Sequence, residues 1–280
     1  MTFHDYINEG KERLFQAGQG EQAAQLLMVE LCRKNDINLY AQMDQQIPEE
    51  IATDYLEGIH KMELGQPLGY VLGYEWFYGY DFIVNEDVLI PRPETEELVG
   101  LVLQLYDDHF SGKEVTVFDV ATGSGAIGIT LDKEEKNMKV FASDISQEAL
   151  EVAKKNNEHL KADVQFYQGS MLDPFIEKDM HCDILVCNPP YIPQEEDMEA
   201  SVVDYEPHVA LFGGDDGLRF YRELFEKADQ VLNEGAILAF EMGYDQGQSL
   251  KELARQYFPN AKIMVHKDMS QKDRMLSIES

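Results

Sequence analysis

Basic residues are scarce in this sequence, and their scarcity limits the partners that the protein can bind. Among its 280 residues are 23 lysines and arginines against 53 aspartates and glutamates, which gives a formal net charge of -30. Non-specific binding to nucleic acid depends on lysine and arginine side chains that neutralise phosphates. A free nucleic acid is therefore a disfavoured substrate, although a local basic patch can be hidden in the sum.

Cysteine is scarce as well. The three cysteines are Cys32, Cys182 and Cys187, and no two of them form a CxxC pair. An odd number without close pairs argues against a disulfide framework and against a zinc site. We therefore expect small buried side chains in a reducing compartment, and no metal site.

Long apolar runs are missing too. No stretch approaches the ~20 apolar residues that a membrane helix requires. Residues 1–14 lack the basic segment and apolar run of a secretory signal. These two absences lead us to expect a cytoplasmic protein that has no membrane partner.

The first 65 residues have the pattern of helices. After Pro48, apolar residues recur at steps of four, four and three, which is the spacing of one helix face; they are Ile51, Tyr55, Ile59 and Met62. Gly65 and Pro67 should end this helix. Residues 70–90 are instead aromatic and β-branched with glycine breaks, which predicts two short strands that link two domains.

From Pro93 onward, helix-like and strand-like segments alternate. We expect strands at 115–119, 139–144, 164–168, 183–187 and 235–242, helices around 98–105, 125–131, 146–159 and 218–232, and one helix and two strands after them. This alternation is typical of a parallel α/β sheet with helices on both faces. The predicted domains are a helical one (1–70), a β-hairpin linker (71–90) and an α/β domain (91–280).

A glycine-rich turn, V-A-T-G-S-G-A-I-G at 120–128, lies between a strand and a helix. Such a turn lets the backbone approach a ligand closely, and a side chain at Gly123 or Gly125 would intrude. Asp144 lies 19 residues beyond Gly125, at the end of the next strand. A carboxylate there can accept hydrogen bonds from both hydroxyls of a ribose, so the pattern predicts a nucleoside ligand.

Asp119, directly before the turn, bears on which nucleoside binds. The turn and Asp144 fit NAD as well as S-adenosylmethionine. An anion at position 119 would repel a pyrophosphate and attract the ammonium group of a methionine moiety. The charge therefore favours S-adenosylmethionine.

The motif Asn188-Pro189-Pro190-Tyr191 follows another strand and should lie on the same rim of the sheet. The side-chain oxygen of Asn188 and the carbonyl of Pro189 can accept hydrogen bonds from the two N–H groups of a planar amide or amine. Because each precedes a proline, both are held in extended conformations, as positioning requires. Tyr191 offers a flat face for the planar group. The alternative is a proline turn with Asn188 as its turn residue.

Four segments carry a family resemblance that spans nearly the whole chain. They are L-I-P-R-P-E-T-E-E-L (89–98), D-V-A-T-G-S-G-A-I-G (119–128), N-P-P-Y-I (188–192) and Y-E-P-H-V-A-L-F-G-G-D-D-G-L (205–218). Together they look like the PrmC/HemK family of release factor glutamine methyltransferases. The third segment is shared with adenine methyltransferases, whereas the first and last narrow the resemblance to this family.

The resemblance implies a class I S-adenosylmethionine-dependent methyltransferase domain, Rossmann-like, with a small N-terminal helical domain that helps to dock the release factor. It implies methyl transfer to the side-chain amide nitrogen of the glutamine in the Gly-Gly-Gln motif of class I peptide chain release factors. No direct contact with nucleic acid is expected.

The resemblance also implies roles for individual residues. The loop around the methionine part would consist of Ala121, Thr122, Gly123, Ser124 and Gly125, with Asp119 beside it. Asp144 would bind the ribose, and Ser170 and Met171 would lie near the adenine. Asn188, Pro189, Pro190 and Tyr191 would hold the glutamine amide, with Asn188 also at the cofactor, and Arg92 and Glu94 would shape the substrate wall.

Two residues depart from the family pattern. Ala121 stands where the loop commonly has glycine, so the loop could be tighter. Ser170 replaces a usual acidic residue, and its hydroxyl can still form a hydrogen bond with adenine. Both departures bear on cofactor affinity rather than on chemistry.

Two other functions compete with this one. An adenine-N6 DNA methyltransferase or a nucleobase-amine RNA methyltransferase could use the same Asn188 grip, but it must extrude a base and hold a polyanion. A binding module without catalysis is the other alternative, because a fold does not fix a function. Asp144 and Asn188 argue against that module.

Overall fold

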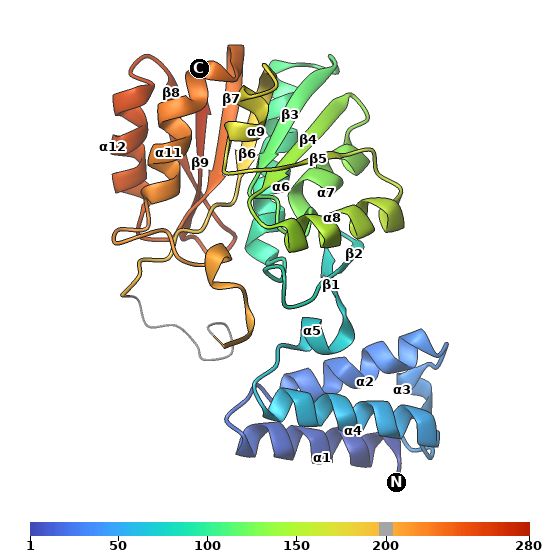
Figure 1. The fold of residues 1–280 in the computed structure, drawn as a ribbon. Coiled ribbons are helices and arrows are strands. Elements are labelled where there is room, and N and C mark those ends of the chain that lie inside the picture. The colour runs from blue at the N-terminus through green and yellow to red at the C-terminus, as the bar shows by residue number, and fades with distance from the viewer. Residues whose placement is uncertain (196–203) are drawn as a thin grey trace. The chain divides into compact units, whose positions relative to one another are not determined.

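The computed structural model describes residues 1–195 and 204–280, which divide into two compact units (Figure 1). The first unit contains Met1–Tyr74 together with Asp204 and Tyr205, and the second contains residues 75–195 and 206–280. Each unit has a hydrophobic core of its own.

The first unit is helical, as the sequence predicted. Its helices are α1 (Phe3–Gln16), α2 (Gln22–Lys34), α3 (Leu39–Gln42), α4 (Glu49–Glu63) and α5 (Leu68–Leu72). The apolar face expected along α4 is buried in the core of this unit, with Tyr55 and Ile59 fully inaccessible. Gly65 follows α4 with a φ of 98°, which a residue with a side chain rarely adopts.

A hairpin follows, formed by β1 (Tyr74–Phe77) and β2 (Tyr80–Ile83). Tyr78 and Gly79 form the connection with φ values of 52° and 84°. Positive φ at both central residues matches the twist of two antiparallel strands. The predicted pair of short strands is confirmed.

The second unit contains a seven-stranded sheet of order β5-β4-β3-β6-β7-β9-β8. Its strands are β3 (Val115–Val120), β4 (Met138–Asp144), β5 (Gln165–Gln168), β6 (Cys182–Cys187), β7 (Leu232–Glu241), β8 (Lys262–Lys267) and β9 (Asp273–Glu279). The expected parallel arrangement holds for β3 to β7 and is wrong for β9, which runs antiparallel to both neighbours. The short connection between β8 and β9 explains this, because a tight turn can join only antiparallel strands.

Helices cover both faces of this sheet (Figure 1). α6 (Pro93–His109) and α7 (Ala126–Glu134) pack on one face, and α8 (Gln147–Leu160) packs against α7. α9 (Asp173–Ile176), α11 (Arg219–Lys227) and α12 (Gly247–Tyr257) pack on the other. Alternation along β3 serves both layers: Val117 faces the first core and Phe118 the second.

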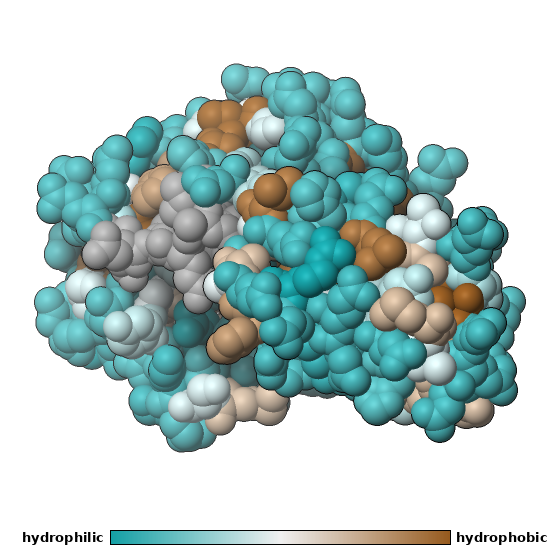
Figure 2. All heavy atoms as spheres, turned by 90° about the horizontal axis from the view of Figure 1, so that it is seen from below, coloured by the Kyte–Doolittle hydropathy of each residue, from teal (hydrophilic) through white to brown (hydrophobic). Residues whose placement is uncertain are grey.

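The surface agrees with the charged composition. Hydrophilic residues cover most of the face seen in Figure 2, and hydrophobic residues form small separate groups on it. Within residues 1–195 and 204–280, we find no helix whose length and apolar character would suit a bilayer. The three cysteines are buried and free, as the sequence predicted.

Candidate functional site

The site lies where the order of the strands reverses. From β3 the chain proceeds outward to β4 and β5, and it then returns to place β6 and β7 on the other side. Ligands of open α/β sheets bind at such a point, outside the carboxyl ends of the strands. The register pairs Val120 with Cys187, so the glycine-rich turn and the Asn188 motif leave the sheet from adjacent strands, about 4.8 Å apart.

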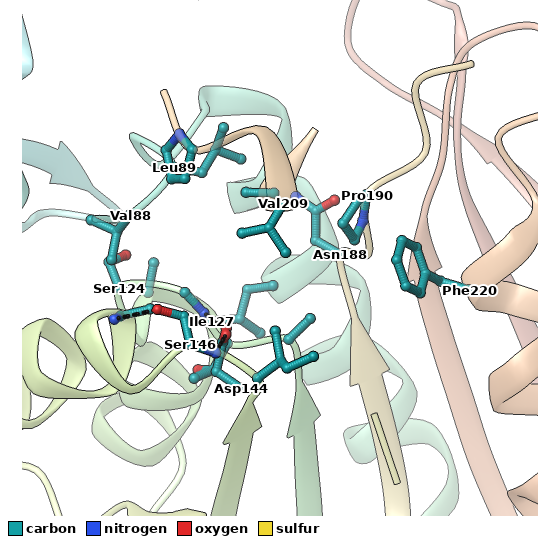
Figure 3. A pocket seen from close by; sticks show the side chains of 18 of the residues that line it. Val88, Leu89, Ser124, Ile127, Asp144, Ser146, Asn188, Pro190, Val209 and Phe220 are labelled. Carbon is teal, nitrogen blue, oxygen red and sulfur yellow. Dashed lines mark hydrogen bonds between the residues drawn. The ribbon is translucent and has the colours of Figure 1, made fainter. Parts of the chain in front are cut away.

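A cavity of about 330 Å³ opens at this point (Figure 3). Most of the predicted site residues line it, namely Arg92, Ala121, Thr122, Gly123, Ser124, Asp144, Ser170, Met171, Asn188 and Pro190. Five others do not: Glu94, Asp119, Gly125, Pro189 and Tyr191. The volume falls in the range of about 300–1,000 Å³ that small-molecule sites occupy.

Asp144 is held firmly at the end of β4. Its Oδ2 accepts a hydrogen bond from Gly123 N at 2.8 Å, and its Oδ1 accepts one from Ser146 N at 2.9 Å. Burial raises the pKa of Asp144, and these backbone hydrogen bonds oppose the shift. Because a carboxylate has about four acceptor positions, each oxygen can accept a further hydrogen bond from a ligand hydroxyl.

The two glycines of the turn have different reasons to lack a side chain. A Cβ at Gly123 would meet no atom within 4 Å, so the cavity in front of it is open for a ligand. A Cβ at Gly125 would lie 2.7 Å from Ile129 Cδ1 and 3.3 Å from Ala153 Cβ. The expectation that a side chain at Gly125 would obstruct a ligand is therefore wrong, because this glycine allows close packing of α7 and α8.

Ala121 carries conformational strain. Its φ is 57°, in the left-handed region that favours glycine. For a residue with a Cβ, this region costs roughly 1–2 kcal/mol. Alanine in place of glycine at this position is thus accommodated at the cost of backbone strain.

Asp119 lies beneath the turn and is fully buried. Its Oδ2 accepts hydrogen bonds from Thr122 Oγ1 at 2.5 Å and from Gly128 N at 2.9 Å. Burial raises the pKa of Asp119 to about 7, against the effect of these two hydrogen bonds. The carboxylate thus ties the turn to α7, and its other oxygen, Oδ1, is buried without a hydrogen-bond partner among the described residues.

Asn188 begins a polar chain that leads from the cavity wall, which Thr95 also lines, to the buried Glu241. Its Nδ2 donates to Thr95 Oγ1 at 3.2 Å, and that hydroxyl donates to Glu241 Oε2 at 2.7 Å. Tyr191 donates to the other carboxylate oxygen, Oε1, at 3.2 Å. The ring of Tyr191 packs against the core and does not line the cavity. The structure therefore does not place this ring where it could contact a planar acceptor in the cavity, as the sequence predicted.

The first and last motif segments meet near the cavity mouth. Arg92 Nη2 lies 2.5 Å from Glu206 Oε1 in an ion pair. Glu206 is only 3% exposed, and within the described residues its Oε2 has no hydrogen-bond partner. Glu94 is exposed, so the structure supports a place in the wall for Arg92 and not for Glu94.

The glycine-rich part of the last segment supports the Asn188 motif from behind. Ile192 N donates to Leu211 O at 3.0 Å, and Gly213 N donates to Ile192 O at 2.8 Å. A Cβ at Gly213 would lie 2.6 Å from the carbonyl oxygen of Pro190. Glycine is needed here because the two backbones are in direct contact.

Ser170 is paired with an acid that the sequence did not reveal. Its Oγ donates to Glu223 Oε1 on α11 at 3.2 Å, and both residues line the cavity. Next to it, Met171 has a φ of 46°, and its carbonyl accepts from the buried Ser143 Oγ at 2.9 Å. A carboxylate is therefore present at this end of the cavity although position 170 lacks one.

Thr95, Asn156, Glu223 and Glu241 are the residues at this site that sequence reasoning missed. Asn156 is buried and ties the turn to the hairpin, because its Nδ2 donates to both Ser124 O and Ile83 O. Thr95 belonged to a recognised segment without an assigned role. The other three stood in no motif, so no signal in one sequence pointed to them.

Comparison with known proteins identifies close relatives. Residues 5–73 match the PrmC N-terminal domain, and residues 100–205 match the Methyltransferase small domain. The chain is 43% identical to the release factor glutamine methyltransferase of Bacillus anthracis, with 100% of this chain and 99% of the relative covered. It is 34% identical, with the same coverage, to the enzyme of that name from Staphylococcus aureus.

The fold also occurs in solved structures. A methyltransferase from Pyrococcus furiosus is 19% identical, with a TM-score of 0.52 over 72% of this chain and 89% of that one. At this identity the likeness concerns the fold alone.

Proposed function

The chain belongs to the family of release factor glutamine methyltransferases, and on that premise we propose that it methylates the side-chain amide nitrogen of the glutamine in the Gly-Gly-Gln motif of class I peptide chain release factors. Its α/β unit has the predicted class I S-adenosylmethionine-dependent, Rossmann-like fold. One observation carries the proposal: Asp144 and Asn188 line the same cavity at the reversal of strand order.

The cavity fits S-adenosylmethionine in two respects. The space in front of Gly123 is open, and both oxygens of Asp144 keep acceptor capacity for ribose hydroxyls. Residues 121–124 would hold the methionine part, and Ser170 and Met171 the adenine. The cofactor supplies an electrophilic methyl group on a sulfonium.

Asn188, which lines the cavity, would hold the acceptor together with the backbone carbonyl of Pro189, a residue that does not line it. An amide nitrogen is a poor nucleophile because its lone pair is delocalised into the carbonyl group. Asn188 Oδ1 and the Pro189 carbonyl would accept hydrogen bonds from the two N–H groups of the amide. These hydrogen bonds would turn the nitrogen lone pair toward the methyl group. Within the described residues, Asn188 Oδ1 accepts no hydrogen bond from the protein, which leaves it available for this role. No strong base is required, because the nitrogen can lose its proton after transfer.

The remaining predictions concern the partner and its location. We propose that the helical domain (1–70) helps to dock the release factor, with 71–90 as linker and 91–280 as methyltransferase domain. We also propose that the protein works in the cytoplasm, where release factors act. The excess of acidic residues argues against a nucleic-acid substrate.

Transfer of a labelled methyl group tests the proposed substrate. The protein is incubated with labelled S-adenosylmethionine and either a class I release factor or DNA and RNA. We expect label on the release factor and none on nucleic acid. Label on DNA or RNA alone would favour the adenine or nucleobase methyltransferase instead.

A further inference from the structure

The carboxamide of Asn188 can be placed in two ways that have the same shape but opposite polarity. If Oδ1 faces the acceptor, it can accept a hydrogen bond from the N–H group of the acceptor. If Nδ2 faces the acceptor instead, two donors meet and repel each other. In the structure, Nδ2 points to Thr95 Oγ1 at 3.2 Å. The neighbours of Asn188 therefore decide which end faces the cavity.

Thr95 imposes this direction. Its hydroxyl has a single hydrogen, which it donates to Glu241 Oε2 at 2.7 Å. An ionised carboxylate can only accept, so the hydroxyl keeps only its lone pairs for Asn188. Asn188 must then present Nδ2 to Thr95 and Oδ1 elsewhere. Thr95 is 5% exposed and Glu241 2% exposed, so water does not compete readily for these groups.

The surroundings of Glu241 allow it to carry its charge. Burial raises its pKa, and nearby Glu94 adds to this, whereas the Thr95 hydrogen bond, Arg274 and the Tyr191 hydroxyl lower it. The Tyr191 hydroxyl donates to Oε1 at 3.2 Å. Both carboxylate oxygens thus have a donor, and the positive charge of Arg274, which is itself paired with Asp268 at 3.3 Å, also favours the ionised form of Glu241.

We infer that Thr95 and Glu241 are positioning residues that hold the carboxamide of Asn188 with its oxygen toward the acceptor nitrogen. Because the acceptor is the glutamine amide proposed above, the role depends on that function. The role does not depend on contact with the substrate, although Thr95 lines the cavity. The polarity of the chain from Glu241 through Thr95 to Asn188 is what matters.

Substitutions at Thr95 test the relay. Thr95→Val keeps the shape of the side chain and removes the hydroxyl. We expect kcat for release factor methylation to fall about 10- to 100-fold, the loss typical when a residue that orients a functional side chain is removed. The Kd for S-adenosylmethionine, measured by calorimetry, should stay unchanged. Thr95→Ser restores the hydroxyl and should restore kcat. The matched control is Thr130→Val, at a buried threonine whose hydroxyl donates only to Ala126 O in its own helix.

Glu241→Gln tests the direction of the relay through pH. In the wild type, kcat at saturating cofactor should fall as pH drops through the raised pKa of Glu241, since a protonated carboxyl can donate to Thr95 and release its orientation. Glutamine at 241 does not titrate and can either donate to Thr95 or accept from it, so the variant should lose this low-pH fall and have a kcat below the high-pH value of the wild type. Wild-type kcat in Thr95→Val, or equal losses in Thr95→Val and Thr95→Ser, would overturn the positioning role. An inactive wild type would instead refute the proposed function.

Discussion

We propose separate tasks for Asn188 and Asp144, which lie at the ends of β6 and β4 on either side of β3. Replacement of Asn188 by alanine removes an acceptor for the substrate N–H, and loss of one such positioned group typically lowers kcat by about 10²–10³-fold. The affinity for S-adenosylmethionine should remain close to that of the wild type. Steady-state transfer and calorimetry measure the two effects separately.

Asp144→Ala should have the opposite pattern, because in the proposed arrangement it removes the carboxylate that accepts hydrogen bonds from the ribose. Hydrogen bonds to a charged group contribute about 1.5–3 kcal/mol, so cofactor affinity should weaken by about 10- to 100-fold. Turnover at saturating cofactor should change much less. If Asn188→Ala lost cofactor binding while turnover persisted, the division of tasks would be wrong.

The strained turn residue gives a prediction about stability. Ala121→Gly relieves the left-handed strain of roughly 1–2 kcal/mol and adds an entropic cost of roughly 0.5–1 kcal/mol. The free energy of unfolding should therefore rise by roughly 0.5 kcal/mol, with cofactor binding retained. Chemical denaturation measures it, and a clear decrease would show that the methyl group contributes packing that exceeds the strain.

At the scale of elements, two backbone segments in contact support the acceptor motif. Gly213→Ala should push the Pro190 carbonyl, because the new Cβ would lie 2.6 Å away in the present geometry. We expect a loss of about 1–3 kcal/mol of stability and a fall in kcat. Gly100→Ala on α6 is the control, because its Cβ would meet no atom within 4 Å, and it should stabilise the helix by about 0.5–1 kcal/mol. Equal effects of the two substitutions would contradict the proposed support.

The strand and helix on either side of the glycine-rich turn could be predicted because the residues that indicate them are adjacent in the sequence. The glycine-rich turn follows a buried strand directly, and Ser146, at the start of the predicted helix 146–159, caps α8 by accepting from Ala149 N. The contact between Thr95 and Glu241 spans 146 residues, and no local pattern reports such a pair. The position of Tyr191 was predicted wrongly for a similar reason. Its place in the motif does not reveal the distant buried carboxylate, Glu241, to which its hydroxyl donates. The antiparallel β9 was missed because alternation of strands and helices gives no direction for a terminal hairpin.

At the scale of the whole molecule, the charge separates the competing functions. A net charge of -30 opposes any polyanionic substrate and favours a basic protein partner, most strongly at low ionic strength. The same rim of the sheet could hold any planar amide or amine. We therefore propose that the partner bound by the whole protein decides which acceptor is methylated.

Mass spectrometry of a class I release factor tests this account most directly. The factor is incubated with the full-length protein and S-adenosylmethionine, digested and sequenced by fragmentation. We predict one added methyl group on the glutamine of the Gly-Gly-Gln motif, and a much smaller methylated fraction after the same time when Asn188→Ala replaces the wild type. An unmodified glutamine, or a methyl group on any other residue, would contradict it.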